Sequence, residues 1–154
     1  MKIHYLPIYL LLATLTCSYY LGYTPLLLTL IYVLLSVVTY IAYAKDKAAA
    51  RNDEWRVPEK TLQLLALCGG WPGALVAQQR LRHKTQKVSF RLMFYVTLVV
   101  NVAAFAGLHS PQGASILHTA LNTADKGLVS LLGKSTTATN VLFFTAFRPS
   151  ISIR

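Results

Sequence analysis

Two charged segments on either side of a glycine-rich break contain the side chains that could do chemistry in this chain. The segments run from residue 45 to residue 60 and from residue 80 to residue 91. The candidate site residues are Asp46, Lys47, Trp55, Arg56, Glu59, Gly69, Gly70, Gly73, His83, Lys84, Thr85 and Lys87. Lysine and arginine are the usual partners of phosphate groups, and glycine lets a backbone approach a ligand closely. If the two segments fold together, their cations could therefore converge on an anion.

The carboxylates of the same segments allow two other roles. Asp46 and Glu59 could form ion pairs with neighbouring cations and hold the two loops together. They could also act with His83 as general acid and base, which requires all three side chains to lie within hydrogen-bond reach. The sequence contains no phosphate-binding loop, nucleophile elbow, zinc-protease motif or paired-cysteine motif, so it predicts no cofactor, no metal and no named catalytic residue. Structural pairing, anion binding and catalysis all stay open.

The composition is typical of a membrane protein. Hydrophobic residues make up 55% of the 154 residues and charged residues 13%, whereas a soluble domain carries about 25% charged residues. The 15 lysines and arginines outnumber the 5 acidic residues, which gives a formal net charge of +10. In a soluble protein this charge would suggest nucleic acid. In a membrane protein it suggests cytoplasmic loops and attraction to anionic lipid headgroups.

Three apolar stretches are long enough to cross a bilayer as helices. They cover about residues 5–22, 26–44 and 88–108, and crossing ~30 Å of hydrocarbon takes about 18–20 residues. The first stretch has the features of a signal peptide as well, but no small-residue cleavage site follows it. We therefore expect an all-α integral membrane fold with three transmembrane helices, the first two joined by the short turn Tyr23-Thr24-Pro25.

A fourth apolar segment, residues 61–79, is interrupted by Gly69-Gly70-Trp71-Pro72-Gly73. Glycine and proline at this density break a regular helix, and each half of the segment is too short to span a membrane. A full span would place the two basic loops on opposite sides, against the preference of such loops for the cytoplasm. We therefore expect a re-entrant pair of half-helices, with both basic loops cytoplasmic. A kinked full span is the alternative.

Several single residues carry structural predictions. Pro58 followed by Glu59 is typical of a helix start, because proline suits the first turn and a carboxylate favours the positive end of the helix dipole. Asn101, inside the third apolar stretch, is expected to form hydrogen bonds across helices. Trp55 and Trp71 are expected to anchor the protein at the membrane interface.

The tail, residues 109–154, differs in character from the rest of the chain. Apolar residues recur at roughly helical spacing from Ile116 to Leu132, which predicts an amphipathic C-terminal helix. We accordingly divide the chain into a transmembrane domain of residues 1–108 and a tail of residues 109–154. With both basic loops in the cytoplasm, three spans place the tail outside.

Four sequence blocks resemble the domain-of-unknown-function family numbered 1294, a group of small bacterial membrane proteins. In order, the blocks are Asp46-Lys47, Trp55-Arg56-Val57-Pro58-Glu59, Gly69-Gly70-Trp71-Pro72-Gly73 and His83-Lys84-Thr85-Gln86-Lys87-Val88-Ser89-Phe90. The resemblance covers about residues 26–108 and implies a protein of the bacterial inner membrane, without an activity. Some members carry an added cold-shock domain, which implies nucleic acid as a partner. The 154 residues contain no such domain, so this implication carries little weight.

The preferred function is a non-enzymatic membrane module that binds an anionic partner at its basic cytoplasmic face. That partner would be a membrane lipid headgroup, a nucleotide or a nucleic acid, all of which carry phosphate. The first alternative is a small transporter or channel, which implies a homo-oligomer with the glycine break along the path. The second alternative is a membrane enzyme that acts on a phosphorylated lipid through Asp46, Glu59 and His83.

Overall fold

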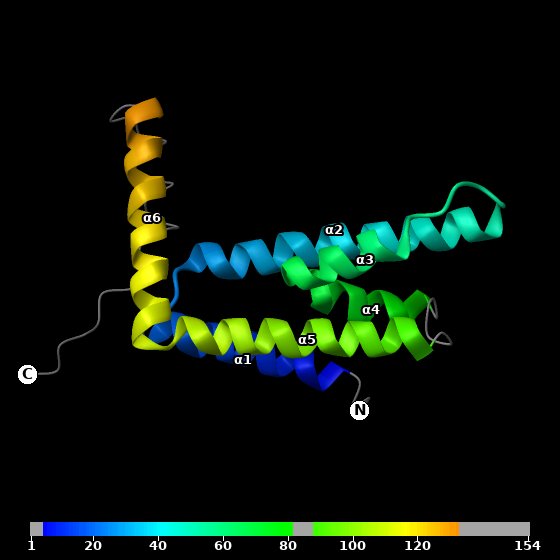
Figure 1. Ribbon diagram of the computed structural model, residues 1–154, viewed down its shortest axis with the longest axis horizontal. Helices are drawn as coiled ribbons and strands as arrows, with labels where there is room; N and C mark the ends of the chain where they lie inside the picture. Colours follow the sequence, from blue (N-terminus) through cyan, green and yellow to red (C-terminus); the bar gives the residue numbers. More distant parts are fainter. Residues whose placement is uncertain (1–4, 82–87, 133–154) are drawn as a thin grey trace, which may run out of the picture. The chain divides into compact units, whose positions relative to one another are not determined.

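The computed structural model describes residues 5–81 and 88–132, and every regular element in these residues is a helix (Figure 1). In chain order the elements are α1 (Leu6–Tyr20), α2 (Leu26–Arg51), α3 (Glu59–Leu65), the π-helical turn η2 (Ala66–Gly70), α4 (Trp71–Leu81), α5 (Val88–Leu108) and α6 (Pro111–Leu132). The predicted all-α class is confirmed. The chain forms two compact units: the first comprises residues 1–8 and 31–104, and the second comprises residues 9–30 and 105–154.

In the first unit, α2 and α5 run antiparallel. The ring centroids of Tyr43 and Phe90 lie 6.2 Å apart, and the Tyr32 hydroxyl donates a hydrogen bond of 3.5 Å to Asn101 Oδ1. Residues later in α2 therefore face residues earlier in α5. Both helices are long and apolar enough to cross a membrane.

Helix α2 extends further than the predicted span of residues 26–44 and ends at Arg51. The extra two turns contain lysines and the alanines of residues 48–50, which are good helix formers. Asp46 and Lys47 therefore lie on the helix, although the sequence placed them in a loop that begins at Lys45. Their side chains have fixed positions relative to the rest of α2.

Helix α1 is shorter than its predicted span of residues 5–22. It contains 15 residues, which makes it about 22 Å long at ~1.5 Å per residue. The chain turns directly after it, and Gly22 adopts a φ of 79° that glycine accepts at little cost. A membrane crossing by α1 stays a prediction, whereas α2 and α5 are long enough to cross a membrane.

Helices α3 and α4 form a hairpin that lies between α2 and α5 (Figure 1). Helix α3 follows the direction of α5, because the Gln63 side chain donates to Phe90 O at 3.0 Å and Asn101 donates to Leu67 O at 2.9 Å. Helix α4 follows the direction of α2 instead. It begins against the middle of α2, and at its other end Lys47 Nζ donates to Leu81 O at 2.5 Å. The chain therefore reverses direction between α3 and α4.

The reversal takes place at the glycine break, which packs directly on α2. Gly69 has a φ of 114°, a conformation that interrupts the helix and favours glycine. A Cβ added to Gly70 would lie 2.0 Å from Thr39 Oγ1, and one added to Gly73 would lie 1.8 Å from Ser36 O. Side chains at these two positions would push α4 away from α2.

Asn101 forms hydrogen bonds with backbone carbonyl groups at the glycine break. Its side-chain nitrogen donates to Leu67 O at 2.9 Å, to Ala66 O at 3.4 Å and to Thr97 O at 3.0 Å. The first two carbonyls belong to η2, where the regular helical pattern is interrupted. The prediction that Asn101 forms hydrogen bonds across helices is confirmed.

Two other single-residue predictions have different outcomes. Helix α3 begins at Glu59, which confirms the predicted helix start, but Pro58 lies at the N-cap position just before the helix and not in its first turn. Trp71 was expected at the membrane interface, but it is only 2% exposed and belongs to the core of the first unit. Trp71 is buried because it begins α4 directly after the break, where the hairpin packs on α2.

The second unit contains a cluster of hydrogen bonds around His109. Ser18 Oγ lies 2.8 Å from His109 Nε2, and the Thr24 hydroxyl donates to Ser18 Oγ at 3.0 Å. The other ring nitrogen of His109 lies 2.9 Å from Phe105 O. Ser18 and Thr24 are buried, so we interpret this cluster as a structural link between the end of α1 and the end of α5. The helix predicted in the tail is α6.

Gly73→Ala should destabilise the first unit because its new Cβ would collide with the backbone of Ser36. Overpacking of this kind costs about 1–3 kcal/mol. Gly107→Ala in α5 is the matched control, because a Cβ there meets no atom within 4 Å and alanine is the better helix former. Thermal unfolding in detergent, followed by circular dichroism, compares the two variants. Equal unfolding midpoints would contradict direct packing of the hairpin on α2.

Lys47→Met should loosen the last turn of α4, because Leu81 O loses the hydrogen bond from the Lys47 ammonium group. A hydrogen bond from a charged group contributes about 1.5–3 kcal/mol, so amide exchange in that turn should accelerate roughly tenfold or more. Hydrogen–deuterium exchange with mass spectrometry measures this rate. Lys45→Met, at an exposed position two residues earlier, should leave it unchanged. If both variants exchange alike, Lys47 does not hold α4 in place.

Candidate functional site

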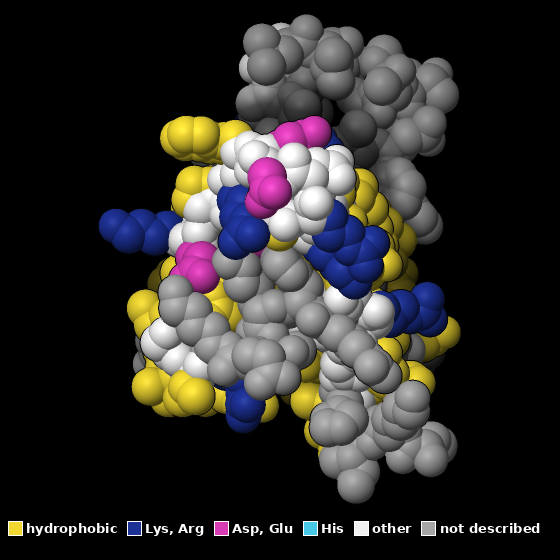
Figure 2. All heavy atoms as spheres, turned by 90° about the vertical axis from the view of Figure 1, so that its right-hand side faces the viewer, with side chains coloured by type: hydrophobic (Ala, Val, Ile, Leu, Met, Phe, Trp, Pro, Cys, Tyr) yellow, Lys and Arg dark blue, Asp and Glu magenta, His cyan; other side chains and the backbone are white. Residues whose placement is uncertain are grey.

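Four helix ends meet at one end of the first unit, which we call the charged end. They are the C-terminal ends of α2 and α4 and the N-terminal ends of α3 and α5 (Figure 1). Among the described residues its exposed cations are Lys45, Arg51, Arg56, Lys60, Arg80 and Arg91, and its exposed acids are Asp53 and Glu54. Figure 2 views this end and shows charged side chains gathered over it, with apolar side chains around its flanks. Cations therefore outnumber acids on this surface.

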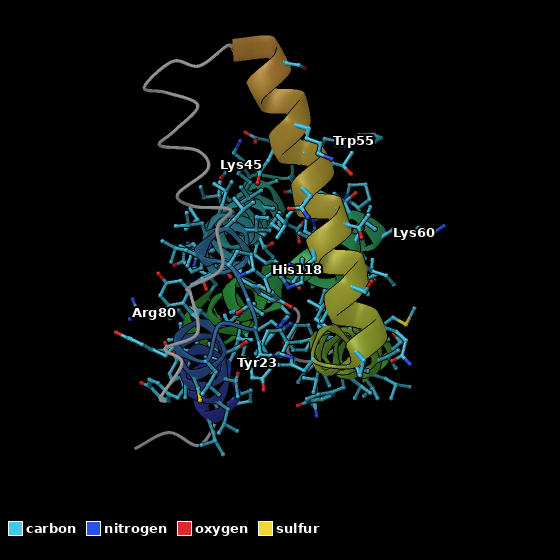
Figure 3. The ribbon with its side chains drawn as sticks, turned by 90° about the vertical axis from the view of Figure 1, so that its left-hand side faces the viewer. Tyr23, Lys45, Trp55, Lys60, Arg80 and His118 are labelled. Atoms are coloured by element: carbon cyan, nitrogen blue, oxygen red, sulfur yellow. The ribbon has the colours of Figure 1, made fainter. Side chains whose placement is uncertain are left out.

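Lys45, Lys60 and Arg80 of the charged end do not point toward one common point (Figure 3). Lys60 and Arg80 extend in opposite directions from the helices (Figure 3). Trp55, in the segment between α2 and α3, is 92% exposed, and Arg56 beside it is exposed as well. This arrangement suits a broad anionic surface better than a small anion that several cations must surround.

The two candidate residues on α2, Asp46 and Lys47, make contacts within the protein that support a structural role. Asp46 is completely buried, and its neighbours include the Tyr43 side chain, which is also completely buried. Lys47 is half-buried and its ammonium group donates to Leu81 O. These contacts join α2 to α4 and support the structural role that the sequence left open for this pair of residues.

The three candidate glycines lie far from the charged end. Gly73 packs against Ser36 of α2, and the eleven-residue separation between Ser36 and Lys47 corresponds to roughly 16 Å along the helix. Gly69 and Gly70 are buried with it. The structure therefore separates the glycine break from the exposed cations, and the two parts of the predicted site do not form one cleft in the described part of the chain.

Of the remaining candidate residues, only Glu59 lies in the part of the chain that the structure describes. Glu59 begins α3 and lines a pocket, discussed below, that does not include Asp46. His83, Lys84, Thr85 and Lys87 lie outside the described residues. Within the described residues, no three histidine, cysteine, aspartate or glutamate side chains come close enough together to hold a metal ion.

Sequence reasoning missed a buried row of polar side chains between α2 and α4. Thr39 and Tyr43 are completely buried, and Gln78 of α4 is 7% exposed. The Thr39 hydroxyl group forms no hydrogen bond within the described residues, and the Tyr43 hydroxyl group lies beside the Gln78 side chain. Thr39, Tyr43 and Asp46 are spaced like one face of a helix, so this spacing in an otherwise apolar segment was the signal that could have revealed them.

The second missed feature is an open pocket between α3 and α5 with a volume of about 550 Å³. Its lining residues are Glu59, Lys60, Gln63, Leu64, Leu67, Ser89, Phe90, Met93 and Thr97. The polar residues at its mouth belong to the charged end, and the side chains further along are mostly apolar. No pattern in one segment predicts this pocket, because its two walls are more than twenty residues apart in the sequence.

Comparison with known proteins identifies relatives of the chain. It is 32% identical over 79 residues to the uncharacterised protein YsdA of Bacillus subtilis (strain 168), and the aligned region covers 51% of this chain and 89% of YsdA. A family model described as a protein of unknown function, DUF1294, matches residues 36–90, which include the glycine break and all the listed cations of the charged end except Arg91. No solved structure matches the chain. By its match to the family model and to YsdA, the chain belongs to the DUF1294 family.

Proposed function

We propose that the chain is an integral protein of the bacterial inner membrane whose charged end lies at the cytoplasmic surface and binds anionic phospholipid headgroups. The observation that carries this proposal is the hydrogen bond from Lys47 to Leu81 O. It joins the end of α2 to the end of α4, so the two charged segments flank the same end of the first unit. A single basic surface results, which the positive-inside preference places in the cytoplasm.

The exposure of α2 and α5 supports a membrane location. Helices of this length and hydropathy also occur in the cores of soluble proteins, but there most of their residues are buried. Here only 11% of the apolar window of α2 and 22% of that of α5 is buried. Many large apolar side chains on both helices face outward, for example Leu34 at 64% and Val99 at 67% exposure. A lipid environment would cover this surface.

The hairpin of α3 and α4 is suited to a re-entrant position within that membrane. Irregular backbone is tolerated at membrane depth when it is enclosed by protein and its polar groups have partners. Gly69 is buried, and the carbonyl groups of Ala66 and Leu67 accept hydrogen bonds from Asn101. We place α1 as the third span, with the bilayer or its flanking residues compensating for its short length.

The distribution of cations favours a lipid surface as the anionic partner. Lys60 and Arg80 point in opposite directions, and Trp55 is exposed as well. Each lysine or arginine near an anionic membrane surface contributes about 1 kcal/mol, and tryptophan is enriched at membrane interfaces. A nucleotide would require several of these cations to converge on one phosphate group.

The two alternatives receive less support from the described residues. A transport path along the glycine break would need space there, but Gly70 and Gly73 pack directly on α2. An enzyme that uses Asp46, Glu59 and His83 depends on a histidine outside the described residues. Asp46 is also completely buried, which limits its access to a substrate.

Cysteine labelling tests the proposed sidedness. In a variant that lacks Cys17 and Cys68, single cysteines at Asn52 and Arg80 should resist an impermeant thiol reagent in intact cells and react after the membrane is opened. Both positions are exposed, so protection would come from the membrane and not from burial. Tyr23→Cys, in the exposed turn before α2, is the control and should react from outside. Reaction of Arg80→Cys in intact cells would contradict a re-entrant hairpin.

Neutralising cations at the charged end should weaken binding of phosphatidylglycerol to the purified protein. Replacing Arg51, Arg56 and Arg80 together by glutamine should reduce affinity by roughly fivefold per charge at low salt, because each charge contributes about 1 kcal/mol. Fluorescent phosphatidylglycerol titrated into detergent-solubilised protein gives the affinity, and the difference should shrink between ~0.1 M and ~1 M salt.

The matched control for that experiment is Lys126→Gln, an exposed cation on α6. It should leave the affinity unchanged. Phosphatidylcholine provides the second comparison and should bind more weakly than phosphatidylglycerol to the wild-type protein. If the two lipids bind equally well, or if salt has no effect, the charged end does not recognise anionic headgroups.

A further inference from the structure

The pocket between α3 and α5 is complementary to a phospholipid, because it has polar residues at one end and mostly apolar residues along the rest of its length. Lys60, Glu59 and Ser89 lie at its mouth, at the charged end, and Leu64, Leu67 and Met93 line its apolar part. These three apolar side chains are 59%, 44% and 57% exposed, so they form an open groove and not a closed core. A ligand that matches this groove has one polar end and one extended apolar part.

We propose that this groove binds one acyl chain of a phospholipid, with the phosphate group at Lys60 and at the N-terminus of α5. The inference rests on the proposed membrane location and adds a defined binding site to the broader charged surface. Two different forces hold the lipid: burial of its acyl chain against α3 and α5, and attraction of its phosphate to the mouth of the groove.

The dimensions of the groove fit one leaflet of a bilayer. Its wall on α5 runs from Ser89 to Thr97, a distance of roughly 12 Å along the helix. One leaflet contributes about half of the ~30 Å hydrocarbon thickness. The groove volume of about 550 Å³ lies within the range of small-molecule sites. An acyl chain that enters from the headgroup level can therefore follow the groove along most of its leaflet.

The mouth of the groove provides three kinds of group for a phosphate. Lys60 carries a positive charge and its side chain is exposed. Ser89, in the first turn of α5, contributes a hydroxyl group that can donate a hydrogen bond. Helix α5 has 21 residues, and the N-terminus of such a helix carries partial positive charge and free N–H groups that favour anions. Glu59 lies at the same mouth, and its carboxylate repels a phosphate group there, so Lys60 and the N-terminus of α5 have to outweigh it.

Filling the groove tests the proposal directly. Met93→Trp places a larger side chain where the acyl chain would lie and should reduce retention of phosphatidylglycerol by roughly tenfold or more. Leu92→Trp is the matched control, because Leu92 is the adjacent residue of α5, is 65% exposed and does not line the groove. Native mass spectrometry of protein released from detergent measures how many lipid molecules each variant retains. The wild type and Leu92→Trp should each retain one lipid tightly.

A second pair of variants tests the mouth of the groove independently of its volume. Lys60→Gln should weaken retention of phosphatidylglycerol, whereas Lys126→Gln, at an exposed cation of α6 that does not line the groove, should leave it unchanged. Leu67→Trp fills the groove from its opposite wall and guards against a folding defect specific to position 93. Phosphatidylglycerol with short acyl chains should compete poorly with the long-chain lipid in the wild type and in variants whose groove stays open.

The outcomes separate this inference from the proposed function. If Met93→Trp and Leu67→Trp fold and retain lipid as the wild type does, the groove assignment is wrong, whereas the salt-sensitive effect of Arg51, Arg56 and Arg80 can still stand. If that triple variant also binds normally, both proposals fail. If the tryptophan variants lower the oligomeric mass and leave lipid retention unchanged, a second copy of the chain occupies the groove, and the phospholipid assignment is overturned.

Discussion

The first unit depends on the hydrogen bonds that Asn101 donates to the broken segment between α3 and α4. Gly69 interrupts the regular helical pattern, and an unsatisfied carbonyl group buried among apolar side chains costs about 1–3 kcal/mol. Asn101 donates to Ala66 O and Leu67 O from the facing helix α5. A continuous helix from Glu59 to Leu81 would be roughly 34 Å long and would carry the second charged segment to the opposite end of the unit. The amide group of Asn101 therefore favours the reversal that keeps both charged segments together.

Close backbone packing provides the second condition for the reversal. Gly70 and Gly73 let α4 approach α2 at Thr39 and Ser36, so that van der Waals contact extends along both helices. Further along, Lys47 connects to the last turn of α4. Gly70 and Gly73, around the beginning of α4, and Lys47 of α2, at the last turn of α4, thus hold α4 against α2 at both of its ends. Lys47, a candidate for anion binding in the sequence, therefore has a structural role in joining α4 to α2.

The sequence predicts the local features of this unit better than its contacts. The helix start at Glu59 and the hydrogen bonds of Asn101 across helices were predictable because each depends on general backbone chemistry: the positive end of a helix in the first case and backbone carbonyl acceptors in the second. The burial of Asp46 and Trp71 could not be predicted, since it depends on which face of α2 and which end of α4 meet after the reversal. The groove between α3 and α5 was not predictable for the same reason. Its two walls come together only because the hairpin places α3 beside α5.

The depth of the hairpin has a consequence for the shape of the first unit in a bilayer. From Glu59 to Gly70 the chain advances roughly 17 Å, about half of the hydrocarbon thickness of ~30 Å. Near the charged end the cross-section of the unit thus contains α2, α3, α4 and α5, and beyond the break α3 and α4 no longer contribute to it. In the proposed orientation, this unit occupies more area in the cytoplasmic leaflet than in the outer one. Such a wedge would make its insertion sensitive to membrane curvature.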